Sequence, residues 1–199
     1  AEAREALKLQ PGLPLVLSVG SIEPRKNQIM ALRAAERLWN EGQEFQLLFI
    51  GWNAWNTEAF EEKVAALQAA GKHVRIVRSA SDDMLSAAYR AARFSVYVSI
   101  AEGHGLHPAE SLAAGTPVVL SDIGSMRETG SAGGAEMVDP RDLNGVVDAM
   151  RLLLTDDSRL AALTAQISHR PQRTWDDYAA ETWDWLINGV EAEETATKS

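Results

Sequence analysis

The chain has 199 residues, of which 46% are hydrophobic and 24% are charged, a composition that suits one soluble globular domain with a substantial core, possibly with appended helices. Its 28 acidic and 19 basic residues give a formal net charge of −9, which argues against a nucleic-acid-binding protein. A small phosphorylated ligand stays compatible with this charge because it needs only a few local cations. The absence of cysteine excludes disulfides and thiolate chemistry.

No apolar run in the sequence approaches the roughly 18 residues of a membrane-spanning helix, so no transmembrane segment is predicted. The first residues are charged and unlike a signal peptide. The chain begins with Ala1 rather than methionine, which is compatible with a removed upstream segment, an excised initiator methionine or a cloned piece.

Short apolar runs alternate with segments of helical periodicity along most of the chain. Near-continuous apolar runs are typical of strands that are buried on both faces of a parallel sheet. The expected strands are 15–19, 46–50, 74–77, 94–98, 117–120 and 136–138, and the helices between them are 27–39, 58–70, 83–92 and 108–115. The alternation predicts an α/β fold with a doubly wound, Rossmann-like parallel sheet of about six strands.

Three further helices are expected at 142–154, 157–166 and 174–188. The last one carries an apolar stripe with three tryptophans, a large apolar surface for a terminal helix. This helix either packs back on its own sheet or partly crosses to a second domain. The small polar residues 189–199 are predicted to be a disordered tail, so the predicted domain spans residues 1–188.

The segment that follows the first strand contains a possible anion site. Gly20 ends the strand, and Arg25 and Lys26 precede a helix for which Asn27 is the expected N-cap. A helix N-terminus with two adjacent cations can bind a diphosphate. The alternative is a solvated basic turn.

A second polar segment, residues 102–110, follows the fourth expected strand and leads into the next helix. Gly103 and Gly105 would let backbone N–H groups approach a ligand closely. Glu110 is expected in the first turn of the helix, facing the same cleft as Glu102. The two carboxylates could accept hydrogen bonds from sugar hydroxyls or form a general acid/base pair, whereas Glu110 alone could simply be a favourable charge near a helix N-terminus.

His104 and His107 lie in the same segment. They are either loop histidines without a ligand role or, with Glu102, part of a metal site. A metal site is the weaker interpretation because no further ligand stands at a suitable spacing.

A third segment, residues 77–83, connects the third expected strand to the next helix, with Ser81 or Asp82 as the expected N-cap. The loop is either an ordinary capped connection or a place where a nucleotide base could lie.

The spacing from Glu102 to Glu110 is a Glu-x7-Glu motif within the stretch AEGHGLHPAESLAAGTPVV. With the upstream VGSIEPRKN and the later TWDDYA, this stretch resembles the glycosyl transferases group 1 family of retaining glycosyltransferases with the GT-B fold. The resemblance covers roughly residues 15–185 and concerns the C-terminal, donor-binding domain of that fold.

The resemblance implies a site for a nucleotide-diphosphate sugar. Arg25 and Lys26 would hold the diphosphate and stabilise the charge on the leaving nucleotide. Glu110 would bind the ribose hydroxyls, Glu102 would contact the transferred sugar, and the loop at 78–79 would lie beside the base. The implied donor-binding residues are Gly20, Arg25, Lys26, Arg78, Ser79, Glu102, Gly103, His104, Gly105, Leu106 and Glu110, and the implied catalytic residues are Arg25, Lys26 and Glu102.

By the same resemblance, the reaction would move a hexose, with mannose as one candidate, from a GDP- or UDP-linked donor with retained anomeric configuration. It would need no cofactor and no metal. A glycan or polysaccharide acceptor would bind mainly to an N-terminal domain that this chain lacks, so the chain alone would bind nucleotide weakly and transfer little or no sugar. The implied location is the cytoplasm, with peripheral contact to the membrane face left open.

The chain departs from the usual family pattern at three positions. His104 stands where the family often has phenylalanine, His107 where it often has proline, and Ser79 where glycine is common. Sugar selectivity and base contacts therefore stay open. The alternative functions are a nucleotide-sugar epimerase of the same fold and a non-catalytic α/β interaction module.

Overall fold

The computed structural model describes residues 7–170 and 174–188, which fall into two units divided after His169. The residues expected to form the tail, 189–199, lie outside the described part of the chain. The expected domain 1–188 covers most of both units.

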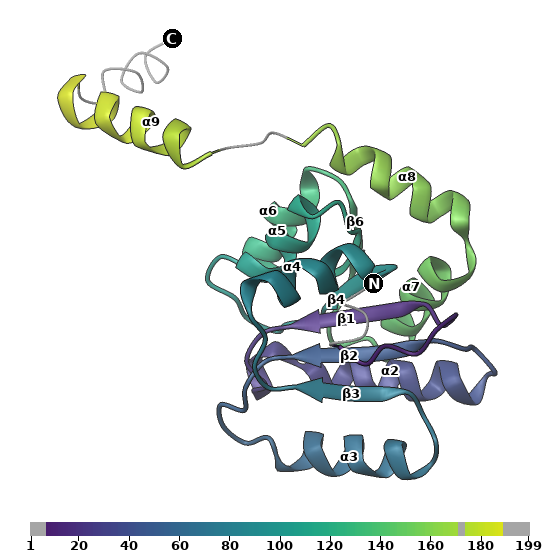
Figure 1. The fold of residues 1–199 in the computed structure, drawn as a ribbon. Coiled ribbons are helices and arrows are strands. Elements are labelled where there is room, and N and C mark those ends of the chain that lie inside the picture. The colour runs from purple at the N-terminus through teal and green to yellow at the C-terminus, as the bar shows by residue number, and fades with distance from the viewer. Residues whose placement is uncertain (1–6, 171–173, 189–199) are drawn as a thin grey trace. The chain divides into compact units, whose positions relative to one another are not determined.

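The first unit is built on one six-stranded sheet in the order β3-β2-β1-β4-β5-β6, in which all neighbouring strands are parallel (Figure 1). This is the doubly wound Rossmann-like arrangement that the sequence predicts. The strands are β1 (Leu15–Val19), β2 (Gln46–Ile50), β3 (Val74–Val77), β4 (Phe94–Tyr97), β5 (Val118–Ser121) and β6 (Ala135–Val138).

Helices cover both faces of the sheet (Figure 1). One face packs against α2 (Gln28–Asn40), α3 (Glu58–Ala69) and α7 (Leu143–Thr155), and α8 (Asp157–Ile167) packs along α7. The other face packs against α4 (Asp82–Ala91), α5 (Leu106–Ala113) and α6 (Gly124–Ser131).

Alternate residues of each central strand enter the two different cores. In β1, Val16 belongs to the α2–α3–α7 core, whereas Leu15 and Leu17 belong to the α4–α5–α6 core. Successive side chains of a strand point to opposite faces, so a strand covered on both faces is apolar at most positions. This explains why the strands read as uninterrupted apolar runs.

Two short elements of the structure were not predicted from the sequence, and one helix starts at a different residue than expected. The missed elements are α6, whose sequence GSMRETGS buries only Met126 and Gly130, and the 3-10 helix η1 (Pro24–Lys26). Neither has the apolar periodicity by which a helix is recognised. Helix α5 begins at Leu106, two residues before the expected start, because Gly105 adopts the left-handed conformation (φ 78°) at its N-cap.

The second unit contains α9 (Trp175–Asn188), close to the expected helix 174–188. None of its residues is buried, and the rings of Trp175 and Tyr178 make an edge contact with centroids 5.9 Å apart. Whether this helix packs on its own sheet or crosses to a second domain therefore stays a prediction. In the part of the chain that the structure describes, no helix combines the length and the apolar character needed to cross a bilayer.

Candidate functional site

The candidate site lies at the point where the direction of chain winding changes. From β1 the chain continues towards β2 on one side, and from β4 it continues towards β5 on the other. Ligands of open α/β sheets bind at the carboxyl ends of the two strands that flank such a point. The loops after β1 and β4 are joined there, because the N–H of Ile100 donates a hydrogen bond to the carbonyl of Arg25 at 2.9 Å.

Asn27 holds this junction together. It occupies the N-cap position of α2, as predicted, but its side chain does not cap the helix. Its Nδ2 instead donates hydrogen bonds to the carbonyls of Val98 and Pro140, both at 2.9 Å. The residue has φ 55°, a left-handed conformation that asparagine tolerates better than most residues. Asn27 therefore ties the β1 loop to the loops after β4 and β6.

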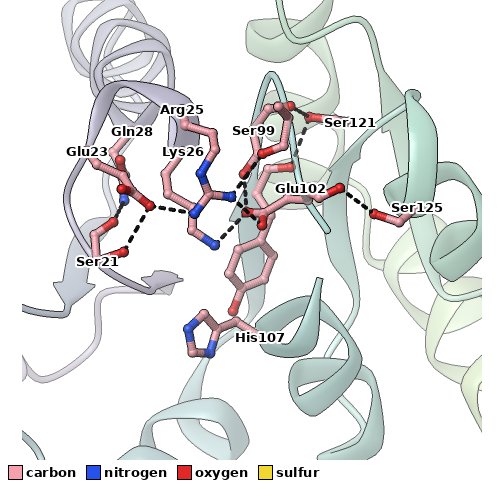
Figure 2. Close-up of polar contacts among 12 residues, drawn as sticks. Ser21, Glu23, Arg25, Lys26, Gln28, Ser99, Glu102, His107, Ser121 and Ser125 are labelled. Atoms are coloured by element: carbon pink, nitrogen blue, oxygen red, sulfur yellow. Dashed lines mark hydrogen bonds and ion pairs between the residues drawn. The ribbon is translucent and has the colours of Figure 1, made fainter. Parts of the chain in front are cut away.

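Glu102 is the centre of a charged cluster (Figure 2). Its Oε2 accepts a hydrogen bond from Nη1 of Arg25 at 2.7 Å, and its Oε1 accepts from Nζ of Lys26 at 2.5 Å and from Oγ of Ser99 at 3.0 Å. Only 7% of the Glu102 side chain is exposed. Burial alone would raise the pKa of Glu102, but the hydrogen bonds and charges of the two cations outweigh it and hold that pKa below its usual value. Arg25, Lys26 and Glu102, which were predicted as site residues in two distant segments, thus lie together.

Glu23 is a second carboxylate of this cluster, and the sequence analysis did not single it out. Its Oε1 accepts from Nη2 of Arg25 at 2.6 Å and from Oγ of Ser21 at 3.1 Å, and its Oε2 accepts from Nε1 of Trp55 at 3.0 Å. Burial opposes the charged form, but these partners together lower the pKa of Glu23. The cluster therefore holds two cations and two carboxylates, which balance each other.

Two glycines allow the loops after β1 and β2 to run in contact. Gly20 and Gly51 follow paired strand ends, and a Cβ atom placed on Gly51 would lie 2.0 Å from the carbonyl oxygen of Gly20. The φ of Gly51 is also positive, at 156°. Beyond the glycines, the N–H of Ile22 donates to the carbonyl of Trp52 at 2.9 Å. Gly20 was predicted as part of the site, whereas Gly51 was not.

Glu110 lies in the second turn of α5, so its predicted place in the first turn was wrong, since the helix starts earlier than expected. Its Oε2 accepts hydrogen bonds from the hydroxyl of Tyr89 at 2.9 Å and from Nδ1 of His107 at 3.2 Å. The Glu110 side chain is 48% exposed. Burial raises the pKa of Tyr89, and its neighbours Tyr97 and Glu110 raise it further, so the phenol stays a hydrogen-bond donor. Glu110 can therefore accept further hydrogen bonds from a ligand while Tyr89 and His107 orient it.

The two histidines of this loop differ in their surroundings. His107 packs against the end of β1, since its Cδ2 lies 3.0 Å from the point where Gly20 would carry a Cβ atom. His104 is exposed, as are Gly103 and Leu106. Within residues 7–170 and 174–188, no three histidine, aspartate or glutamate side chains gather as a set of metal ligands.

Arg78 and Ser79 lie at the end of β3, which β2 and β1 separate from β4 in the sheet. The guanidinium of Arg78 binds Oε1 of Glu61 at 2.5 Å and also contacts Asn53. These contacts connect Arg78 to α3 and to the β2 loop rather than to Glu102. Ser81 accepts a hydrogen bond from the N–H of Met84 at 3.3 Å, which confirms it as the N-cap of α4.

Residues 1–170 match the sequence profile of the family described as glycosyl transferases group 1. The chain belongs to this family. It is 31% identical over 169 residues to the O-antigen chain mannosyltransferase B of Escherichia coli, an alignment that covers 83% of this chain and 44% of that protein. It is also 33% identical over 200 residues to a D-inositol 3-phosphate glycosyltransferase of Thermobispora bispora, covering 96% of this chain and 47% of that protein.

The chain spans less than half the length of these group 1 relatives. Its fold is that of GT-B glycosyltransferase structures. One of them is WaaG, a glycosyltransferase involved in lipopolysaccharide biosynthesis, with a TM-score of 0.74 and 19% identity over 94% of this chain and 50% of the WaaG chain. At this identity the similarity concerns the fold alone.

Proposed function

We propose that this group 1 glycosyltransferase chain binds a nucleotide-diphosphate sugar at the carboxyl ends of β1 and β4 and forms the donor-binding part of a retaining hexosyltransferase. The observation that carries the proposal is the meeting of Arg25, Lys26 and Glu102 at this point, with Lys26 and Glu102 joined at 2.5 Å. This arrangement supports the proposal because one nucleotide sugar could contact the cations through its diphosphate and the carboxylate through its sugar hydroxyls.

Arg25 and Lys26 are the proposed diphosphate contacts. Arginine offers a planar set of donors and lysine a compact ammonium, and both stabilise phosphate oxygens. The same two charges would stabilise the nucleoside diphosphate as it leaves the sugar, where a divalent ion serves in other enzymes. Both cations bind Glu102, so the diphosphate must share them with that carboxylate or displace it.

Glu110 is the proposed ribose contact. Glu110 is on α5, the helix that follows the Glu102 loop. Its carboxylate is oriented by Tyr89 and His107. A carboxylate can accept hydrogen bonds from both hydroxyls of a ribose.

A mannosyl donor is the proposed sugar class, because several relatives carry mannosyltransferase in their names. The proposed acceptor is a glycan or polysaccharide. Since the chain spans less than half of these relatives, we propose that most acceptor contacts come from residues outside it and that this chain by itself transfers little sugar.

Calorimetric titration of the chain with GDP, UDP and ADP tests the proposed donor site. We expect selective binding to one of them, and this binding should be lost in Arg25→Ala/Lys26→Ala. Arg33→Ala/Lys63→Ala is the matched control, because it removes the same charge from α2 and α3, away from the cluster. Equal affinity of the wild type and the Arg25/Lys26 variant would contradict the proposal, as would the absence of binding to all three nucleotides.

A further inference from the structure

His107 lies beside the charged cluster but is not among the proposed contacts to the nucleotide sugar. Its side chain lies against Gly20 at the carboxyl end of β1. The position that a Cβ atom of Gly20 would occupy lies 3.0 Å from Cδ2 of His107 and 3.8 Å from Cε of Lys26, so the two side chains are neighbours. The imidazole lies near Lys26 (Figure 2) and so borders the proposed diphosphate site. Its Nδ1 contacts Glu110.

The two ring nitrogens of His107 have different surroundings. Nδ1 lies 3.2 Å from Oε2 of Glu110, and because a carboxylate only accepts, Nδ1 must carry the proton of this hydrogen bond. Nε2 lies on the Gly20 side, 3.4 Å from the Cβ point of that glycine, and takes part in none of the hydrogen bonds of the described residues. The His107 side chain is 34% exposed, so part of the ring faces solvent.

We propose that Nε2 of His107 donates a hydrogen bond to the donor diphosphate beside Lys26, an inference that rests on the proposed function. A diphosphate oxygen of a nucleotide sugar accepts hydrogen bonds, so Nε2 must carry a proton to bind it. Nδ1 also carries a proton, which it donates to Glu110. Both nitrogens must therefore be protonated, so His107 binds the diphosphate as an imidazolium. Donor binding at this site takes up a proton when His107 starts out neutral.

The charges around His107 favour this step. Glu110 on α5 stabilises the imidazolium, and the hydroxyl of Tyr89 on α4 donates to the same carboxylate. From the β1 loop Lys26 opposes the imidazolium, but Glu102 binds the ammonium of Lys26 at 2.5 Å and offsets its charge. The bound diphosphate adds negative charge next to both cations. His104 is the other titratable group of the loop, and it is exposed.

Titrations with GDP-mannose and UDP-glucose test the inference, because their diphosphates have no terminal phosphate that titrates near neutral pH. For the probe that binds, we expect affinity to be about tenfold higher at about pH 5.5 than at about pH 8, which corresponds to one charge-assisted hydrogen bond. Titration at neutral pH in two buffers with different ionisation enthalpies should show net proton uptake.

His107→Gln should remove this pH dependence, because a neutral amide replaces the imidazole. His107→Phe is the second variant, since it keeps a ring beside Gly20 and should remove the pH dependence as well. His73→Gln is the matched control at the opposite, amino end of β3, and it should keep the wild-type pH dependence.

Each result bears on a different claim. Binding by the wild type that does not change with pH, or pH dependence that persists in both His107 variants, would overturn the inference and leave the donor site intact. A wild type that binds neither these nucleotide sugars nor GDP, UDP or ADP at any pH would refute the proposed function, and the role of His107 with it.

Discussion

The ammonium group of Lys26 lies 2.5 Å from Oε1 of Glu102, although the two residues are 76 positions apart in the sequence. Arg25 binds the other carboxylate oxygen. Glu102 therefore pairs with both cations of the site, although the Arg25 side chain is still 39% exposed. Any anionic ligand that enters the site competes with Glu102 for them.

This competition predicts that Glu102→Gln binds nucleoside diphosphate more tightly than the wild type. The amide keeps the shape of the side chain but releases the charge of Arg25 and Lys26, so we expect an affinity for the preferred nucleotide about 3- to 10-fold higher. Glu136→Gln, which breaks an ion pair with Arg159 elsewhere, is the control and should leave the affinity unchanged. Weaker nucleotide binding by the Glu102 variant would show that the carboxylate positions the cations instead.

The lowered pKa of Glu102 predicts that part of the free energy of unfolding depends on pH. The pKa of Glu102 in the folded chain lies below its ordinary value of 4.5, so the unfolded chain binds more protons just below that pH. The stabilisation is therefore complete above pH 4.5 and is lost as the pH falls through the lower folded pKa. Urea unfolding should show Glu102→Gln about 1–3 kcal/mol less stable than the wild type at neutral pH, with a smaller difference in acid. A difference that does not depend on pH would contradict this origin.

Gly51→Ala should destabilise the fold strongly. Its methyl group would lie 2.0 Å from the carbonyl of Gly20, a backbone atom that cannot move without disturbing the site. We expect a loss of about 3 kcal/mol or more, measured by urea or thermal unfolding. Gly71→Ala is the matched control: its φ is 75° but the space around it is open, so only the roughly 1 kcal/mol cost of the left-handed conformation should appear. Equal losses would show that the contact with Gly20 can relax.

Glu110→Ala should weaken nucleotide binding by roughly 1–3 kcal/mol, the cost of losing hydrogen bonds to a charged group. A 2′,3′-dideoxy nucleotide, which lacks the ribose hydroxyls, should bind the wild type less tightly and should bind the variant as well as the normal nucleotide does. Glu44→Ala, at an exposed position before β2, is the control. If the variant distinguishes the two nucleotides as the wild type does, Glu110 does not bind the ribose.

The local sequence carried most of the fold. Strands such as 15–19 and 46–50 were predicted with the bounds that the structure has, because strands covered on both faces are apolar at nearly every position. The elements that were missed, α6 and η1, are short and contribute few buried side chains, so their sequences carry no periodic signal.

The sequence by itself also predicted the centre of the candidate site, since Gly20, Arg25, Lys26 and Glu102 follow strand ends that a parallel sheet brings to one edge. Only the tertiary structure decided their partners. Asn27 binds the carbonyl of Pro140, 113 positions away, instead of capping its own helix, and Glu23 and Gly51 join the site through loops that meet in space. Periodicity and spacing report contacts along a helix or strand, whereas these contacts depend on how loops from different strands pack against one another.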